Sequence, residues 1–282
     1  MRSRSLVRSA GGALGLVSAI AALGTAAAHA ADGWPAAVQA TYDVDFNGLN
    51  VGSYHFSSTH DGHTYTLTSS AKLSLLLGAL RWTGDTQATG QVSGEHAKPK
   101  SFGFNYQAQS KAGSTRMAFT GDTVTQVLQD PPAKIKEGFI PVQESQLKGV
   151  LDPLSAVLAI SAGTSGNPCN RRIPIYDGTQ RFDLVLSPKG QVALEDRKPS
   201  GQPTSGYVCR VRYIPIAGYR PDDGTKYMAH NNDIEIVLRP LPNANIFIPY
   251  KVTIPTIAGP ATITARRVNV TTNTQQQIAL GQ

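Results

Sequence analysis

The chain of 282 residues has only two cysteines, Cys169 and Cys209, and no C-x-x-C pair. Two isolated thiols supply too few ligands for a structural zinc site. The chain also lacks a cluster of lysines and arginines, although its formal net charge is +7. A nucleic-acid-binding surface requires a basic patch or stripe. The sequence therefore predicts no cysteine-based metal centre, no cofactor and no nucleic-acid partner.

Catalytic motifs are missing as well. The string G-T-S-G-N (163–167) lacks the second glycine of a nucleophile elbow and is typical of a loop after a helix. Asp177 and Asp183 are candidates for the paired carboxylates of a glycosidase. Asp177, however, belongs to an Asp-Gly turn, and Asp183 alternates with apolar neighbours, which favours a structural ion pair. We expect no enzyme activity, and a hydrolase is the least favoured alternative.

Histidine is scarce, and its one local cluster consists of His55, His60 and His63 with Asp61 beside them. Imidazoles at this spacing could meet a transition metal across a hairpin. A solvated turn is the favoured interpretation, because no H-x-x-x-H helix or nearby cysteine completes a site. No metal site is predicted.

Residues 1–30 have the pattern of a secretory signal peptide. Arg2, Arg4 and Arg8 form a basic end, residues 10–27 are small or apolar without charge, and Ala28-His29-Ala30 is a small–x–small cleavage pattern. The apolar core is short and rich in glycine and alanine, so a retained membrane anchor is disfavoured. We expect export and a mature chain from residue 31, whose net charge falls from +7 to about +4.

Export bears on the two cysteines. In an oxidising compartment two cysteines of one chain usually pair, so a Cys169–Cys209 disulfide is predicted. In the chain-entropy model, closing a loop of this length stabilises the fold by about 4 kcal/mol.

The mature chain has the alternating pattern of β-strands, with Asn47-Gly48 as a strong hairpin signal. The sequence predicts one β domain over residues 31–270, a hairpin through 187–190, and a polar, frayed tail over 271–282. The predicted strands cover residues 40–46, 51–58, 64–70, 83–90, 101–109, 114–120, 123–128, 172–176, 180–186, 191–195, 207–216, 233–238, 247–254 and 261–270.

One helix is predicted among these strands, over residues 152–161. Asp152 can cap its first amides, and Pro153 suits a first helical position because it needs no donor there. Leu154, Val157 and Leu158 then fall on one stripe. A lone helix must bury this stripe against the sheet. The predicted fold is therefore all-β: a curled antiparallel sheet or incomplete barrel with the helix packed inside as a plug.

The most apolar run of the mature chain spans residues 73–82. A buried turn and strand is the favoured interpretation, and a mobile lid at a cavity mouth is the alternative. The side chains predicted to line a ligand cavity are Leu75, Leu76, Leu77, Leu80, Trp82 and Tyr213. Six strand arginines are interpreted as coating the outer face, with gripping of an acidic headgroup inside the sheet as the alternative: Arg181, Arg210, Arg212, Arg239, Arg266 and Arg267.

A series of landmarks resembles a known family. They are T-Y-D-V-D-F-N-G-L-N-V-G (41–52), T-G-Q-V-S-G (89–94) with K-P-K-S-F-G-F (98–104), D-P-L-S-A-V-L-A (152–159), C-N-R-R-I-P-I-Y-D-G (169–178) with R-F-D-L (181–184), Cys209, and I-P-Y-K-V-T-I-P-T (248–256). Together they resemble the domain of unknown function 3108 family, exported envelope proteins of Gram-negative bacteria. The resemblance implies a design similar to the periplasmic lipoprotein-carrier fold, an open barrel around an apolar interior. It implies no catalytic residue.

These observations favour a non-enzymatic periplasmic envelope protein that binds a lipid-like or other apolar ligand in the concave interior of the sheet. A structural or protein-interaction module, with partners on the sheet edges or on loop 197–206, is the second hypothesis. No membrane-spanning segment is expected after signal cleavage.

Overall fold

The computed structural model describes residues 34–75, 78, 80–133, 135–163, 166–194 and 200–281, except for the Leu75 side chain. Two α-helices, α1 (Pro153–Ser161) and α2 (Asp223–His230), accompany fourteen strands. The strands are β1 (Ala37–Phe46), β2 (Leu49–His60), β3 (Thr64–Leu75), β4 (Leu80–Ser93), β5 (His96–Ala108), β6 (Lys111–Thr120), β7 (Thr123–Asp130), β8 (Arg171–Tyr176), β9 (Arg181–Ala193), β10 (Ser205–Ala217), β11 (Ile234–Leu241), β12 (Ile246–Thr256), β13 (Gly259–Thr271) and β14 (Gln277–Gly281).

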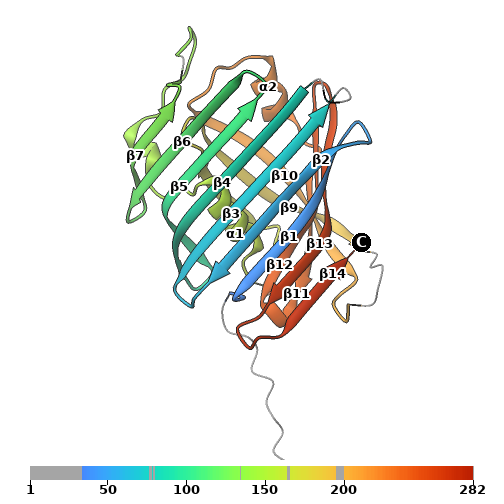
Figure 1. Ribbon diagram of the computed structural model, residues 1–282. Helices are drawn as coiled ribbons and strands as arrows, with labels where there is room; N and C mark the ends of the chain where they lie inside the picture. Colours follow the sequence, from blue (N-terminus) through green and yellow to red (C-terminus); the bar gives the residue numbers. More distant parts are fainter. Residues whose placement is uncertain are drawn as a thin grey trace, which may run out of the picture.

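All strands belong to one antiparallel sheet in the order β7-β6-β5-β4-β3-β2-β1-β13-β12-β11-β10-β9-β8, and β14 pairs with β13 beside this path. The sheet is not closed, because β7 and β8 end it without pairing with each other. The sheet curls so that strands β1–β6 face β9–β12 across the interior (Figure 1). The predicted fold class, a curled antiparallel sheet, is confirmed.

Side-chain alternation explains which face of the sheet is buried. On β3, Tyr65 and Leu67 are buried, whereas Thr64 and Thr66 are exposed. Neighbouring side chains of a strand point to opposite faces, so a period of two gives one apolar and one polar face. The β1–β2 turn uses Asn47 and Gly48 at positive φ of 51° and 77°, as the hairpin signal predicts.

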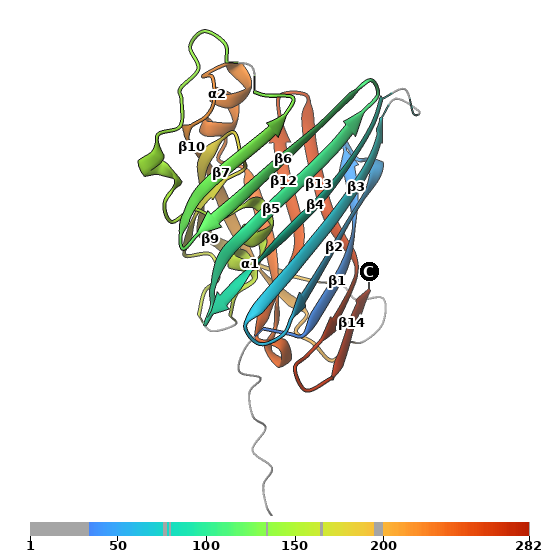
Figure 2. The same cartoon turned by 60° about the vertical axis from the view of Figure 1, so that its left-hand side comes forward.

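Helix α1 lies inside the curl, where it contacts β3, β4 and β5 on one side and β8 and β12 on the other. Figures 1 and 2 show it between the two faces of the curled sheet. Leu154 and Leu158 belong to a core cluster formed mainly by β1–β6, β12 and β13, whereas Ala156 belongs to a second cluster with β8–β11. The helix therefore joins two apolar cores, as the plug prediction requires.

Two strand predictions are wrong. The predicted hairpin through 187–190 is the middle of the continuous strand β9, which absorbs Pro188 and Lys189 in a bulge where Val208 pairs with Gly190 and Cys209 with Pro188. Proline is tolerated in a sheet at such bulges, so Ser-Pro-Lys-Gly is not a reliable turn signal here.

The predicted frayed tail is the second error. Residues 277–281 form β14, which buries Ile278 and Leu280 against β13. Its Ile-Ala-Leu alternation is short and follows a polar stretch, which explains the misinterpretation.

Helix α2 was not predicted from the sequence. Asp222 caps it by accepting a hydrogen bond from the Thr225 amide, and the helix buries none of its residues. Because no residue of α2 is buried, the helix could not be recognised from a stripe of buried apolar residues. Neither described helix is long and apolar enough to cross a lipid bilayer.

The apolar run over 73–82 is a hairpin end rather than buried core in its described part. Strand β3 ends at Leu75 and β4 begins at Leu80, whose side chain is 46% exposed. Trp82 is half-buried and lies against Phe104, with ring centroids 6.3 Å apart. A hairpin that extends past the enclosed part of a sheet leaves apolar residues without covering neighbours. Leu76 and Leu77 lie outside the described residues.

Candidate functional site

The start of α1 is held by a buried polar network. Asp152 is fully buried, and its Oδ1 atom accepts hydrogen bonds from the amides of Leu154 and Ser155, both at 3.0 Å. The Ser155 hydroxyl donates to Oδ2 of the same carboxylate and lies 2.7 Å from the Tyr65 hydroxyl of β3. The cap therefore also fixes the helix to the sheet, as expected for a buried polar group whose hydrogen bonds are satisfied.

Burial dominates the titration of this network. It raises the pKa of Asp152 to about 6, although the hydrogen bonds from Ser155 and Leu154 act in the opposite direction. Burial also raises the pKa of Tyr65, so this hydroxyl stays protonated.

This pKa predicts an unusual pH dependence of stability. The pKa of Asp152 is about 6 in the folded state against 3.8 for the free side chain, so the folded protein binds more protons in this interval. Its stabilising contribution is complete below about pH 4 and is lost as the pH rises through 6. We expect the stability of the wild type relative to Asp152→Asn to fall by up to about 3 kcal/mol across this range.

Urea unfolding at a series of pH values measures this difference. Asparagine keeps an oxygen for the two backbone amides but replaces the Oδ2 acceptor of the Ser155 hydroxyl, so the change of the difference with pH, rather than its size at one pH, reports the charge. A difference between the two proteins that stays constant with pH would contradict the prediction.

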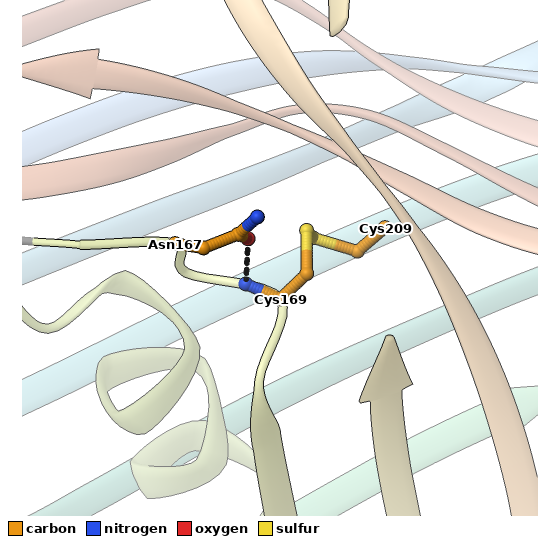
Figure 3. The surroundings of a disulfide bond; sticks show 3 residues. All are labelled: Asn167, Cys169 and Cys209. Carbon is orange, nitrogen blue, oxygen red and sulfur yellow. Dashed lines mark hydrogen bonds between the residues drawn. A yellow bond between two sulfur atoms is a disulfide. The ribbon is translucent and has the colours of Figure 1, made fainter. Parts of the chain in front are cut away.

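The disulfide fastens the segment that follows α1. Cys169 and Cys209 are bonded, with Cα atoms 5.2 Å apart, and both are buried. The Asn167 side chain accepts a hydrogen bond of 2.9 Å from the Cys169 amide (Figure 3). The bridge joins the chain just before β8 to strand β10, so the exit of the helix is covalently tied to the sheet.

The last turn of α1 is held by Arg171. Its guanidinium donates to the carbonyl oxygens of Ala159 and Ala162. A cation near the carboxyl end of a helix also interacts favourably with the helix dipole. Both ends of α1 are thus fixed by side chains, and the helix is a rigid inner wall.

The interior of the curl contains a cavity beside the first turns of α1, called here the mouth cavity. Its volume is about 530 Å3, and Pro153, Leu154 and Val157 form its helical wall. The remaining lining comes from the inner face of β2–β6, from the end of β7 and from the β8–β9 turn: Tyr54, Ser69, Thr86, Phe102, Phe104, Tyr106, Ser114, Thr115, Gln129, Asp130, Pro131, Ala133, Asp177 and Thr179. Asp130, Pro131 and Ala133 are exposed, so the cavity opens at this rim.

A second, narrower cavity lies farther inside and is called here the inner pocket. Val157 lines both spaces, and Leu158 and Tyr42 line the inner pocket alone. Trp34 also lines it, and its indole N–H donates to the Gly94 carbonyl at 3.1 Å. The rings of Tyr42 and Tyr54 lie 5.9 Å apart between the two spaces. Val157 therefore separates the two cavities, and Tyr42 and Tyr54 each line one of them.

A third concavity, of about 900 Å3, lies on the outer face of the sheet. Outward side chains of Ser, Thr, Asn and Gln dominate its lining, for example Thr68, Gln87 and Asn105. Such residues are typical of a solvated sheet face, so this groove carries no chemistry of its own.

The predicted lining residues lie elsewhere. None of Leu80, Trp82 and Tyr213 lines the three described cavities. Tyr213 is nevertheless close to the mouth cavity, since its hydroxyl donates to Gln180 at 2.9 Å beside the β8–β9 turn. The predicted plug residues are the ones that reach the interior: Pro153, Leu154, Val157 and Leu158.

The aromatic lining was missed by the sequence analysis. Tyr54, Phe104 and Tyr106 point to the inner face of the sheet, on which buried residues of the same or the neighbouring strand also lie. Tyr54, for example, is paired with the buried Tyr42. Extending the strand alternation across each hairpin would have found them.

The two aspartates weighed as glycosidase carboxylates have structural roles. Asp177 accepts the amides of Thr179 and Gln180 at 2.8 and 2.7 Å, as in the predicted turn. Asp183 is buried and forms ion pairs with Arg172 and Arg181, so the predicted structural ion pair is confirmed.

The histidine cluster lies at a solvated turn, and one of the six strand arginines departs from its predicted position. Asp61 accepts hydrogen bonds from the His63 and Thr64 amides, which forms the solvated turn. In the described part of the chain, no group of three or more His, Cys, Asp or Glu side chains is placed to hold a metal. Arg239 corrects the outer-face interpretation, because it is buried and donates to Ser200.

These features define a class of protein: an open, curled antiparallel sheet that encloses a capped helix and an apolar interior. Residues 41–266 match the family described as "Protein of unknown function (DUF3108)", and the chain belongs to that family. No curated protein and no solved structure matches the chain. The family resemblance is confirmed, whereas the envelope location and the likeness to the lipoprotein-carrier fold stay predictions.

Proposed function

We propose that this protein is a non-enzymatic periplasmic cell-envelope protein that binds an apolar or lipid-like molecule in the mouth cavity. The observation that carries the proposal is the lining of this space. Aromatic side chains of β2 and β5 and aliphatic side chains of α1 line a space of about 530 Å3, together with hydroxyl side chains of β3, β4 and β6. Ligand pockets in proteins typically have this volume, and aromatic side chains are common in their linings.

The rigidity of the wall supports binding rather than a packing defect. Both ends of α1 are fixed, by Asp152 at the start and by Arg171 at the end. The disulfide then holds the chain that follows. A cavity between rigid elements cannot collapse, so its surface gains dispersion contacts when an apolar molecule enters.

The periplasmic location is supported by two independent features. Residues 1–30 carry the pattern of an export signal. The Cys169–Cys209 disulfide is typical of an oxidising compartment.

Cavity filling tests the proposal. Val157 lines both inner spaces, so Val157→Phe places a ring in the path of the ligand, whereas Val157→Ala leaves the space open. Solvent extraction and mass spectrometry of the purified mature protein should detect an apolar molecule in the wild type and in Val157→Ala. We expect at least about tenfold less in Val157→Phe, since 1.4 kcal/mol of lost binding is a factor of ten.

Thermal unfolding of both variants provides the control for folding. Preparations of folded wild type that never contain or take up an apolar molecule would refute the proposal. Equal amounts of ligand in a folded Val157→Phe would place the binding site elsewhere.

A protein-interaction module is the second candidate, favoured by the open sheet. β8 is an edge strand. On its free side, the one β-bridge among the described residues joins Leu151 to Ile175. Exposed edges recruit partner strands. Crosslinking in cells, compared with a variant that lacks loop 197–206, would separate this function from ligand binding, because the described residues of the loop, 200–206, line none of the three cavities.

A further inference from the structure

The rim of the mouth cavity has a distinct electrostatic character. Among its described lining residues, Asp130 and Asp177 are the only carboxylic acids, and none is Lys, Arg or His. Asp130 ends strand β7 and is exposed. Asp177 belongs to the β8–β9 turn, so the two carboxylates come from the two ends of the open sheet.

These two ends meet at the rim. The Gln129 side chain of β7 donates to the Gly178 carbonyl at 3.1 Å and to the Thr179 hydroxyl at 2.6 Å. The residue before Asp130 is thus bonded directly to the residues that follow Asp177. Asp130 and Asp177 therefore line the same opening.

The N-terminus of α1 is the part of the cavity wall best suited to bind an anion, but its amides already have hydrogen-bond acceptors. A helix N-terminus attracts anions through its free amides and its dipole. At the start of α1, however, Pro153 has no amide hydrogen, and the Leu154 and Ser155 amides both donate to Asp152. The helix start therefore presents no free donor to a carboxylate or phosphate in the cavity.

The lining of the mouth cavity thus combines aromatic and aliphatic side chains with hydroxyl groups, and its rim carries two aspartates. An amphiphile bound with its chain inside places its polar end beside Asp130 and Asp177. Like charges at short separation repel strongly where water is partly excluded, and opposite charges attract. An anionic polar end would meet two carboxylates and no described cation in this lining.

We propose that the ligand of this site is an amphiphile whose polar end carries an amine, and that the acidic rim discriminates against anionic amphiphiles such as fatty acids. This inference rests on the proposed function, because it assigns the headgroup of the same ligand.

Three probes of equal chain length test it with the full mature protein: dodecylamine, dodecanol and dodecanoate below their micellar concentrations. Displacement of a neutral apolar dye gives the three affinities. We expect dodecylamine to bind most tightly and dodecanoate to bind at least about tenfold more weakly at pH 7.

Variants assign the preference to the rim. In Asp130→Asn/Asp177→Asn the ratio of amine to carboxylate affinity should fall toward one, and dodecanol affinity should be unchanged. Asparagine at 177 still offers an oxygen to the Thr179 and Gln180 amides. Asp85→Asn/Asp223→Asn removes the same charge from exposed positions outside the cavity and should keep the wild-type ratio.

Lys134 is next to Ala133 in the sequence and lies outside the described residues, so Lys134→Ala is measured in parallel. Dodecanoate bound as tightly as dodecylamine by the wild type would overturn the headgroup assignment while leaving the apolar site in place. A preference unchanged in the rim variant would also overturn it. Failure of all three probes to displace the dye would refute both the proposed function and this inference.

Discussion

Replacing both cysteines with alanine is expected to lower the free energy of unfolding by about 4 kcal/mol. The bridge closes a separation of 40 residues, and a loop of this size loses about that much conformational free energy in the chain-entropy model. Both residues are buried in the second core, so alanine also removes apolar contacts there. Urea unfolding of the Cys169→Ala/Cys209→Ala variant measures the change.

The matched control is the wild type unfolded with and without a reducing agent. Reduction of the native bond should reproduce most of the loss, because it removes the crosslink without changing the side chains. A decrease below about 1 kcal/mol in both experiments would show that the bridge constrains the unfolded chain little.

Asp183→Ala is expected to destabilise the fold by about 3 kcal/mol or more. The side chain of Asp183 is 6% exposed and that of its partner Arg181 is 13% exposed, with an N–O distance of 2.5 Å. Removing one member of a buried pair leaves the other charge without compensation, which typically costs about 3–5 kcal/mol. Chemical denaturation at neutral pH would measure this effect.

The second partner, Arg172, provides the contrast. Its side chain is 61% exposed, so water screens its interaction with the same carboxylate at 2.7 Å. Arg172→Gln should therefore change stability by less than about 1 kcal/mol. Similar losses for Asp183→Ala and Arg172→Gln would contradict the view that burial of Arg181 decides the energetics.

Local signals predicted much of the architecture. The capped helix follows from Asp152-Pro153 because capping depends on a few neighbouring residues. The hairpin at Asn47-Gly48 likewise follows from the backbone preference of two residues. The disulfide could be predicted without knowledge of the fold, since the chain has two cysteines and an N-terminal pattern that predicts export.

The errors arise where pairing with a strand that is distant in the sequence determines the local structure. Pro188 continues a strand because Cys209 and Val208 of β10 accommodate it in a bulge. Ile278 and Leu280 form a strand because β13 offers a free edge to pair with. Neither partner can be recognised from a short window of sequence.

The candidate site shows the same division. Leu154, Val157 and Leu158 were assigned to the interior because one helix has one apolar stripe. The rim of the mouth cavity was missed because Asp130 and Asp177 are 47 positions apart in the chain and meet only when the sheet curls. From the sequence alone, Asp177 is predicted only as the first residue of an Asp-Gly turn.

The pairing of β1 with β13 sets the timing of folding. Ala37 pairs with Thr271, so strand β1 can complete its pairing only after residues near the C-terminal end of the chain are available. Contacts this distant in sequence make folding slow, because a long loop must close before they form. Until β13 emerges, one edge of β1 stays unsatisfied and open to aggregation. We therefore expect nascent chains truncated before β12 to depend on chaperones, however complete their local hairpins are.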